Sequence, residues 1–297
     1  MKFDFLSESD QAYFIHKAST LVEALPYIRQ HSGKNIVIKY GGHTMGDIKL
    51  AKSFSQDIGL LKEVGINPII VHGGGPQIGD MLKNKNIKSQ FVKGLRVTDY
   101  ETVKIVEEVL SKDINSKIVE DIIATGGKAI GLSGHLDNII EAEKLKIKMQ
   151  DSDSNIEKLL DLGFVGKPTK INIDKIHESL SKGYIPVIAP LGQDKEKNIY
   201  NINADTAAGA IAGAMKASKL ELLTDVAGVL DRNNKLISSL SLKDAKRIIN
   251  EDYIVGGMRP KIETCINAID RGVKEATILD GRIPHSLILE LFTEHGI

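Results

Sequence analysis

Two short apolar runs of the chain each end in a cluster of glycines. Residues 35–40 lead into Gly41 and Gly42, and residues 67–72 lead into three glycines at 73–75. Runs of this length, rich in isoleucine and valine, predict buried strands, and the glycines let the chain turn sharply into a helix. At the carboxyl end of a parallel sheet, such turns also let backbone amides approach a phosphate. The two turns predict an α/β fold with an anion site at one sheet edge, although sharp turns without a ligand would use the same glycines.

Strand and helix patterns alternate along most of the chain. We expect strands at 35–40, 67–72, 128–132, 185–190, 219–224 and 276–279, and helices at 48–64, from 77, 100–124, 174–183, 204–217, 242–250, 261–271 and from 286. This alternation predicts a three-layer α/β/α sandwich with an open, mainly parallel central sheet. Residues 135–172 are interpreted as a hairpin-rich insertion with an acidic loop at 151–155 and a turn at 166–168. No linker is apparent, so one continuous sheet is expected, with a division near residue 195.

A further helix is predicted before the first strand. Apolar residues recur at helical spacing between 11 and 31, which makes residues 1–32 an N-terminal appendage to the alternating pattern. An apolar stripe at a chain end either docks on its own core or contacts a second subunit, and both possibilities stay open.

The balance of charges and the single cysteine exclude several classes of protein. Lys and Arg total 39, as do Asp and Glu, so the formal charge is zero, which argues against nucleic-acid and acidic-membrane partners and favours a small molecule. Cys265 alone cannot form an intramolecular disulfide or a cysteine-based zinc site, and it fits a reducing compartment. No apolar run approaches the roughly 18 residues of a membrane span, and residues 1–10 do not look like a signal or transit peptide. We expect a cytoplasmic protein, or one of the plastid stroma.

Several charged residues occupy positions that suit an anionic ligand. Lys39 lies near the end of a buried strand, so it either holds a phosphate or reaches solvent from a sheet edge. Arg96 precedes a helix that begins near Asp99, where it either grips a carboxylate or caps a surface turn. Asp205 opens a helix of unusually small residues, where it acts either in a site or only as a cap. Lys261 lies in the first turn of a helix, against the helix dipole, which indicates a nearby anion.

Two common nucleotide-binding motifs are missing. The chain has no G-x-x-x-x-G-K-[ST] motif, and neither glycine turn reads G-x-G-x-x-G. A Walker-type NTPase and a nicotinamide-dependent oxidoreductase both lose support, since the latter also needs an acidic residue about 20 positions after its glycines. The predicted phosphate site is therefore of another kind.

Six segments in order resemble a known family. They are IVIKYGG, VHGGGPQI, KGLRVTD, NINADTAAG, LLTDVAGVL and GGMRPKIE, which run from about residue 35 towards the C-terminus. The set resembles the amino-acid-kinase fold and, within it, the N-acetyl-L-glutamate kinase branch. This resemblance implies ATP-dependent phosphorylation of the γ-carboxylate of N-acetyl-L-glutamate, a step of arginine biosynthesis. It also divides the chain into an N-terminal oligomerisation helix at 1–32, an acetylglutamate-binding lobe at 33–195 and an ATP-binding lobe at 196–297.

The resemblance also implies roles for particular residues. Lys39 and Lys261 would stabilise the transition state, with Asp205 orienting both, and the Gly42 and Gly74 amides would bind the moving phosphoryl group. Acetylglutamate contacts would come from Gly74, Gly75, Arg96 and Asn201. The nucleotide would lie along Asp225, Val226, Gly228, Val229, Leu230, Tyr253 and Val255. Mg²⁺ is expected to bridge the phosphates with little direct protein ligation, so no metal-binding residue is predicted.

The two chain ends resemble those of the arginine-inhibited members of the family. In such members an extra N-terminal helix joins three dimers into a ring, and L-arginine is the inhibitor. The matching arginine-site residues here would be Tyr13, Lys216, His285, Glu290 and Gly296, with Lys219 as the other candidate for the lysine. In photosynthetic relatives the nitrogen-signalling protein PII relieves this inhibition, so the resemblance also implies PII as a partner.

Two other functions remain open, together with the roles of two single residues. The chain could be another amino-acid kinase of the same fold, or a non-catalytic nucleotide-binding regulator that would be expected to lack Lys39, Asp205 or Lys261. His72 lies beside the glycines, but a carboxylate nucleophile is already ionised at pH 7 and needs no general base, so His72 is interpreted as structural. Cys265 is interpreted as a small core residue.

Overall fold

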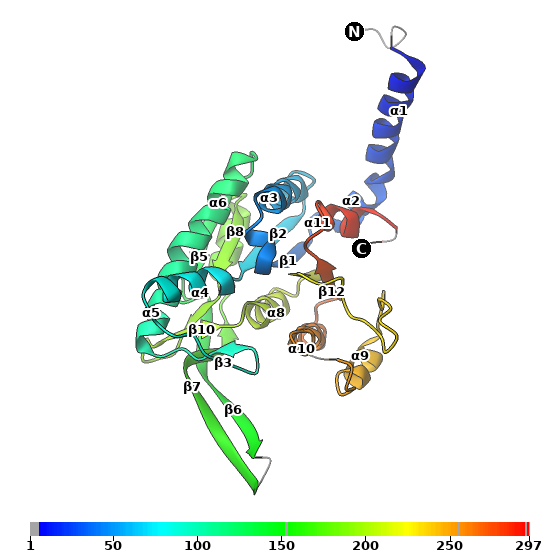
Figure 1. The fold of residues 1–297 in the computed structure, drawn as a ribbon. Coiled ribbons are helices and arrows are strands. Elements are labelled where there is room, and N and C mark those ends of the chain that lie inside the picture. Colours follow the sequence, from blue (N-terminus) through cyan, green and yellow to red (C-terminus); the bar gives the residue numbers. More distant parts are fainter. Residues whose placement is uncertain (1–5, 152–153, 255, 295, 297) are drawn as a thin grey trace.

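The computed structural model describes residues 6–151, 154–254, 256–294 and 296. Its centre is a parallel sheet with the strand order β12-β11-β1-β2-β8-β5 (Figure 1). In chain order, these strands are β1 (Asn35–Tyr40), β2 (Asn67–His72), β5 (Ala129–Ser133), β8 (Ile185–Ala189), β11 (Lys219–Thr224) and β12 (Glu275–Asp280). The predicted strands and the open parallel sheet are confirmed.

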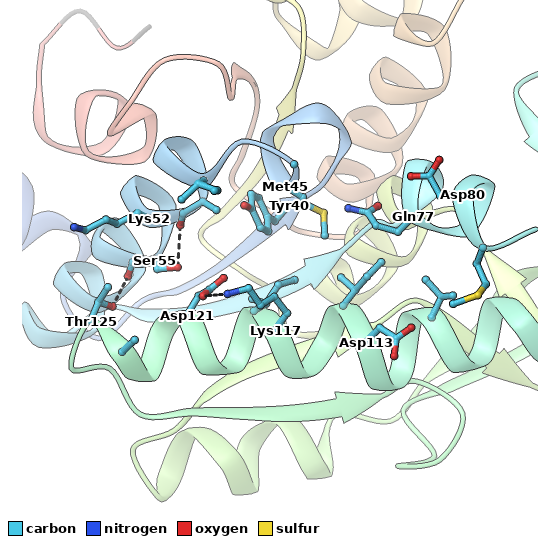
Figure 2. Close-up of a pocket in the computed structure, with 18 of the residues that line it drawn as sticks. Tyr40, Met45, Lys52, Ser55, Gln77, Asp80, Asp113, Lys117, Asp121 and Thr125 are labelled. Atoms are coloured by element: carbon cyan, nitrogen blue, oxygen red, sulfur yellow. Dashed lines mark hydrogen bonds and ion pairs between the residues drawn. The ribbon is translucent and has the colours of Figure 1, made fainter. Parts of the chain in front are cut away.

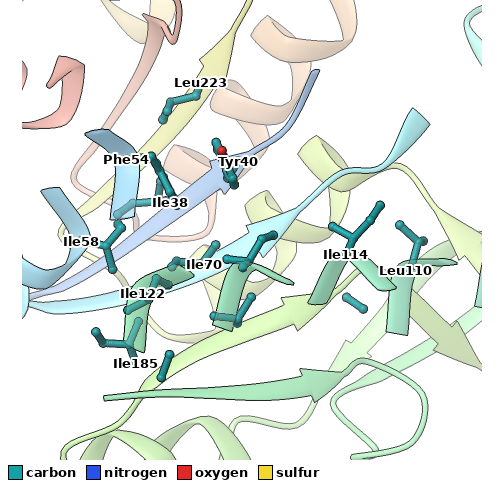
Figure 3. Packing of buried hydrophobic residues seen from close by; sticks show 14 of the residues in the cluster. Ile38, Tyr40, Phe54, Ile58, Ile70, Leu110, Ile114, Ile122, Ile185 and Leu223 are labelled. Atoms are coloured by element: carbon teal, nitrogen blue, oxygen red, sulfur yellow. The ribbon is translucent and has the colours of Figure 1, made fainter. Parts of the chain in front are cut away.

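Helices cover both faces of this sheet (Figure 1). Ile36, Ile38 and Tyr40 of β1 face a core shared with one layer of helices, part of which Figure 3 shows. This layer contains α3 (Ile48–Glu63), α4 (Gly75–Asn84), α5 (Tyr100–Glu108), the π-helical segment η3 (Val109–Ile114), α6 (Asn115–Ala124) and α11 (Ser286–Phe292). On the opposite face lie α7 (Asp174–Ser181), α8 (Ala204–Ala214) and α10 (Met258–Asp270), while α9 (Leu242–Ile248) packs on α10.

Alternation along the strands determines which helix each polar side chain meets. Val37 of β1 belongs to the core on the α8 side, and Lys39, two residues later, therefore points to the same side. His72 of β2 follows Ile70 by two residues and faces the α6 side instead. The small residues of α8 let α10 approach closely, because a Cβ on Gly209 would lie 2.6 Å from Thr264 Cγ2. Close helix packing thus accounts for the small-residue pattern.

The predicted N-terminal helix is two helices. α1 (Glu8–Glu23) ends at Ala24 and α2 (Leu25–His31) follows at once, with Pro26 in its first turn. Tyr27 and Ile28 of α2 pack on the core. α1 buries none of its residues and projects from the body of the molecule (Figure 1).

The insertion is a long two-stranded ribbon whose base is closed into a small barrel. β6 (Ile140–Asp151) and β7 (Ser154–Ile171) pair in antiparallel fashion, and β9 (Leu191–Gln193) and β10 (Ile199–Ile202) complete the barrel. The predicted turn at 166–168 is wrong, because Gly166, Lys167 and Pro168 pair in register with Lys144, Glu143 and Ala142 of β6, between two register shifts. Residues 152–153 of the predicted acidic loop lie outside the described residues.

Two short elements complete the chain. The 3₁₀ helix η2 (Gly42–Met45) follows β1, and β3 (Phe91–Val92) pairs with β4 (Leu95–Arg96) in a small hairpin. No helix in the described part of the chain is long and apolar enough to cross a membrane.

Candidate active site

Two lysines from opposite parts of the chain meet one carboxylate. Lys39 Nζ lies 3.1 Å from Asp205 Oδ1, and Lys261 Nζ donates to Asp205 Oδ2 over 2.7 Å. Lys39 comes from β1, Asp205 from the first turn of α8 and Lys261 from the first turn of α10. Asn203, rather than Asp205, caps α8 by accepting from the Thr206 amide, which leaves Asp205 for the lysines. We call Lys39, Asp205 and Lys261 the cleft cluster.

The cleft cluster is largely buried, with Lys261 its most accessible member, and it carries an excess of positive charge. Lys39 and Asp205 are 8% and 7% exposed, too little for Lys39 to be an edge residue reaching solvent. Burial lowers the pKa of Lys39, and Lys261 adds to the lowering, while Asp205 opposes it. Burial favours the neutral acid at Asp205, yet the two ammonium groups hold the pKa of that carboxyl below its ordinary value. With all three groups ionised, two ammonium groups face one carboxylate, and the surplus suits an anion such as a phosphoryl group.

The two glycine turns approach each other beside this cluster. A Cβ on Gly41 would lie 3.3 Å from Gly73 Cα and from Lys39 Cε, and the Gly73 amide donates to Tyr40 O over 2.7 Å. Gly42 has a φ of +77°, which glycine adopts without strain. A Cβ on Gly74 would lie 2.5 Å from Ile114 Cδ1. Close packing and backbone conformation therefore both require glycine here.

Arg96 and Asn201 lie on the same side of the site. Arg96 is buried, donates from Nη2 to Gly75 O over 2.8 Å, and contacts Ser89 and the Phe91 ring. A surface arginine is therefore excluded. Asn201 Nδ2 lies 3.5 Å from Thr98 Oγ1, two residues beyond Arg96. The structure thus brings Gly75 and Arg96 into contact and links Asn201 to the same segment.

The predicted nucleotide residues lie at and beyond the end of β11. The Asp225 carboxylate is close enough to raise the pKa of Lys39, so it lies near the cleft cluster. Gly228 and Val229 line a cavity of about 430 Å³, while Val226 and Leu230 are exposed. Tyr253 lies beneath the Arg232 guanidinium, 5.4 Å from ring centroid to Cζ. Val255 lies outside the described residues.

A second charged cluster lies at the opposite end of the sheet. Lys219, the first residue of β11, forms ion pairs with Glu221 at 3.5 Å, Glu275 at 3.2 Å and Glu290 at 3.2 Å. We call these four residues the acid cluster. Although burial opposes it, the carboxylates raise the pKa of Lys219. Burial raises the pKa of Glu221 to about 7, despite the attraction of Lys219.

The predicted arginine-site residues are brought together only in part. A Cβ on Gly296 would lie 2.5 Å from Glu290 Oε2, so these two residues are in contact. Lys219, not Lys216, is the lysine that pairs with Glu290, because Lys216 is exposed after the end of α8. His285 Nδ1 pairs with Asp57 Oδ1 of α3 at 2.6 Å. Tyr13 is exposed on the projecting α1.

A separate groove lies behind the glycine turns. It has a volume of about 680 Å³ and runs between α3, α4 and α6, with Tyr40, Met45, Gln77, Lys117 and Asp121 in its lining (Figure 2). Lys117 and Asp121 pair with each other at 2.5 Å. None of the predicted site residues lines this groove, so this groove is separate from the predicted active site.

Sequence reasoning missed the side chains that support the glycine turns. Leu110 and Ile114 of η3 cover Gly74, and Asn115 Nδ2 lies 3.2 Å from His72 Nε2. An asparagine within a long helical pattern was the only signal available, since such a residue often has a specific hydrogen-bond partner. Ser89 and Thr98, which hold Arg96 and Asn201, carried no signal.

Comparison with known proteins places the chain in a family. Residues 34–280 match the model of the amino acid kinase family. The chain belongs to this family, whose fold agrees with the parallel sheet covered by helices described above.

The closely similar relatives are more specific. Over 283 residues the chain is 56% identical to acetylglutamate kinase of Rhodospirillum centenum, covering 95% of this chain and 93% of that protein. It is 55% identical to acetylglutamate kinase of Mesorhizobium japonicum over 280 residues, covering 94% of each. Within the family the chain groups with the acetylglutamate kinases, and it is a phosphotransferase that uses a carboxyl group as acceptor.

Solved structures agree with this placement. N-acetylglutamate synthase of Neisseria gonorrhoeae, complexed with coenzyme A and N-acetyl-glutamate, superposes with a TM-score of 0.80 at 25% identity. The match covers 94% of this chain but only 62% of that one. Carbamate kinase of Giardia lamblia bound to AMP-PNP, at 16% identity and a TM-score of 0.56, shares the fold.

Proposed function

We propose that this protein transfers the γ-phosphoryl group of ATP to the γ-carboxylate of N-acetyl-L-glutamate, as a step of arginine biosynthesis. The observation that carries the proposal is the buried cleft cluster with its surplus positive charge. Phosphoryl transfer asks a protein mainly for alignment of the reacting groups and for charge stabilisation, and both are available here. N-acetyl-L-glutamate is inferred as the acceptor because the relatives described above are acetylglutamate kinases.

The cleft cluster suits both sides of the transferred group. Lys39 approaches from the sheet and Lys261 from α10, so the two ammonium groups would neutralise charge on the phosphoryl oxygens as it moves. Asp205 holds both lysines in place and does not act as a base, because the acceptor carboxylate is already ionised at neutral pH. The Gly42 and Gly74 amides would donate to the same oxygens.

The two substrates would enter from opposite lobes. Residues 33–195 would bind acetylglutamate, with Arg96 taking the α-carboxylate and Gly74, Gly75 and Asn201 completing the contacts. Residues 196–297 would bind ATP along 225–230 and near Tyr253 and Val255. Among the described residues no group of three or more His, Cys, Asp or Glu is placed to hold a metal ion. As the resemblance implies, Mg²⁺ would be held mainly by the nucleotide phosphates and would neutralise part of their charge.

Feedback inhibition and assembly are the finer parts of the proposal. The acid cluster, with three carboxylates around Lys219, suits a cationic ligand such as L-arginine. Lys219 also influences the pKa of His31, at the end of α2, so the cluster adjoins the N-terminal helices. Exposed Phe14, Leu21 and Val22 on α1 support self-association, and the resemblance implies that the assembly is a trimer of dimers. PII binding remains a prediction from the resemblance, and a cytoplasmic or plastid location remains a prediction from the sequence.

The test is release of ADP by purified protein with ATP, Mg²⁺ and N-acetyl-L-glutamate, compared with L-glutamate and L-aspartate and repeated with millimolar L-arginine. Turnover with acetylglutamate alone, abolished by arginine, is expected. Turnover with another acid instead would make the chain a different amino-acid kinase, and no turnover with any acid would favour a nucleotide-binding regulator. Turnover unaffected by arginine would remove the regulatory part alone.

A further inference from the structure

The inference concerns how the glycine turn at 73–75 is held. The Gly73 amide donates to Tyr40 O over 2.7 Å, and Gly74 O accepts from the Ile78 amide over 2.9 Å. The structure records no acceptor for the Gly74 amide among the residues it describes. Gly74 is buried and is the N-cap of α4, where the helix dipole favours an anion. What orients this amide therefore bears on the proposed reaction.

The orientation of the Asn115 side chain is determined by two backbone carbonyls. Asn115 Nδ2 lies 2.9 Å from Val187 O and 3.3 Å from Leu132 O. Carbonyl oxygens only accept hydrogen bonds, so the group between them is the NH₂ and not the amide oxygen. The same Nδ2 lies 3.2 Å from His72 Nε2. The two hydrogens of this NH₂ are shared among three acceptors, and Nδ2 has no lone pair to accept a proton from Nε2, so His72 Nε2 faces a donor and carries no proton.

The other nitrogen of His72 leads to the same tautomer independently. Nδ1 lies 2.9 Å from Gly73 O, which again can only accept, so Nδ1 carries the proton. Burial lowers the pKa of His72 to about 4, which keeps the ring neutral at physiological pH. Both partners thus require the neutral ring protonated at Nδ1.

The position of the Gly73 carbonyl also determines the direction of the Gly74 amide, because both groups belong to one peptide unit. The structure contains no cis peptide bond among its described residues, and in a planar trans peptide the C=O and the next N–H point in opposite directions. When His72 holds the Gly73 carbonyl on the α6 side of the sheet, the Gly74 amide is turned away from that side. The opposite face is the α8 side, which carries Lys39 and also Ala204, whose Cβ would lie 3.9 Å from a Cβ on Gly73.

We propose that Asn115 and His72 are positioning residues that hold the Gly74 amide towards the transferred phosphoryl group. This rests on the proposed function for its effect on turnover. Asn115 selects the tautomer, His72 fixes the Gly73 carbonyl, and the peptide presents its amide to the cleft. Neither side chain touches a substrate, and neither exchanges a proton during the reaction.

The tautomer is measured directly by ¹⁵N NMR of histidine-labelled protein, with His72 assigned by its disappearance in His72→Gln. The Nδ1–H form is expected from pH 6 to 8, with no titration. A proton on Nε2, or an imidazolium in that range, would overturn the proposal whatever the protein's activity. Asn115→Leu removes the donor that faces Nε2 and should shift part of the His72 population to the Nε2–H form. An unchanged spectrum would show that Asn115 does not select the tautomer of His72.

The effect on turnover is tested with two amide variants of His72. His72→Asn places an amide donor near the position of Nδ1, whereas His72→Gln places it near Nε2 and leaves Gly73 O without its donor. We expect His72→Gln to lower kcat about 10–100-fold with KM for acetylglutamate within about threefold, because one oriented amide donor is affected. His72→Asn should lose less than about fivefold.

The exposed His177 on α7 provides the matched control, because His177→Gln should leave turnover and melting temperature unchanged. A purely structural role would lower the activity of both His72 variants in parallel with their melting temperatures, and this outcome would overturn the proposal. If the wild-type protein does not phosphorylate acetylglutamate, the proposed function fails while the NMR result still decides the tautomer.

Discussion

Two clusters of charged, mostly buried side chains lie at opposite ends of one parallel sheet, and their charge balances differ in sign. The cleft cluster near the carboxyl end of β1 has two lysines and one carboxylate, whereas the acid cluster at the start of β11 has one lysine and three carboxylates. Both require desolvation of charges, which is costly unless partners or a ligand compensate. The surplus charge of each cluster suits a ligand of the opposite sign, which is an anion at the cleft cluster and a cation at the acid cluster in the proposed function.

The cleft lysines should show the largest effect. Lys39→Met and Lys261→Met are each expected to lower kcat by about 10²–10³, or about 3–4 kcal/mol in the activation barrier, as for loss of a donor to a charged transition state. Steady-state ADP release measures the change. Lys175→Met, at an exposed lysine on α7, is the control and should keep full activity. A loss below tenfold at both cleft lysines would contradict the assigned role.

Removing the shared carboxylate should have the next largest effect. Asp205→Asn leaves Lys39 and Lys261 facing each other without their common partner. The pKa of Lys39, already lowered by burial, should then fall further. We expect kcat to fall about 10²-fold, with the alkaline limb of the pH profile at lower pH than in the wild type. An alkaline limb that did not move would show that Asp205 does not control the charge of Lys39.

The acid cluster should make the free energy of unfolding depend on pH. Burial raises the pKa of Glu221 from 4.5 to about 7, so the folded state binds more protons than the unfolded state between these values. The free energy of unfolding therefore falls as pH rises through this range. Glu221→Gln removes this dependence. Between pH 5 and pH 8 the free energy of unfolding of the variant should therefore rise by roughly 2–3 kcal/mol relative to that of the wild type. Urea denaturation at both pH values measures it, and an equal difference at the two pH values would argue against a buried, protonatable Glu221.

A smaller effect is expected on inhibition. Glu290→Gln removes one carboxylate from the acid cluster and should raise the arginine concentration for half-inhibition about tenfold, typical of one charged hydrogen bond. Glu294→Gln, an exposed carboxylate in the same terminal segment, is the matched control. Equal sensitivity of both variants to arginine would place the arginine site away from the acid cluster.

The sequence predicts the cleft cluster better than the acid cluster, and the reason is physical. Lys39, Asp205 and Lys261 each occupy a position that local rules mark as unusual: a lysine near the end of a buried strand, and charges at two helix starts. At the acid cluster, Lys219 lies at the first position of a strand, and only Glu221 of its three partners is close in sequence, since Glu275 and Glu290 come from β12 and α11. Only the packing of distant elements shows that Lys219, rather than Lys216, meets Glu290.

The insertion and the residues that support the glycine turns also depend on contacts between distant parts of the chain, which local sequence patterns do not predict. The ribbon was predicted from alternation, but barrel closure by β9 and β10 depends on pairing between distant strands. The run at 166–168 contains glycine and proline, which predict a turn, yet it pairs with β6 as strand between two register shifts. Asn115 lies 43 positions from His72 in sequence, so no local pattern connects them.

The most direct test of the central claim compares a transition-state mimic with the ground state. Affinity for acetylglutamate with ADP, Mg²⁺ and aluminium fluoride is measured in wild type and Lys39→Met, beside affinity for acetylglutamate alone. If the cleft cluster acts on the moving phosphoryl group, Lys39→Met should weaken the mimic about 10²–10³-fold and acetylglutamate alone by less than about threefold. An equal loss for both ligands would show that Lys39 only binds substrate and would contradict the account.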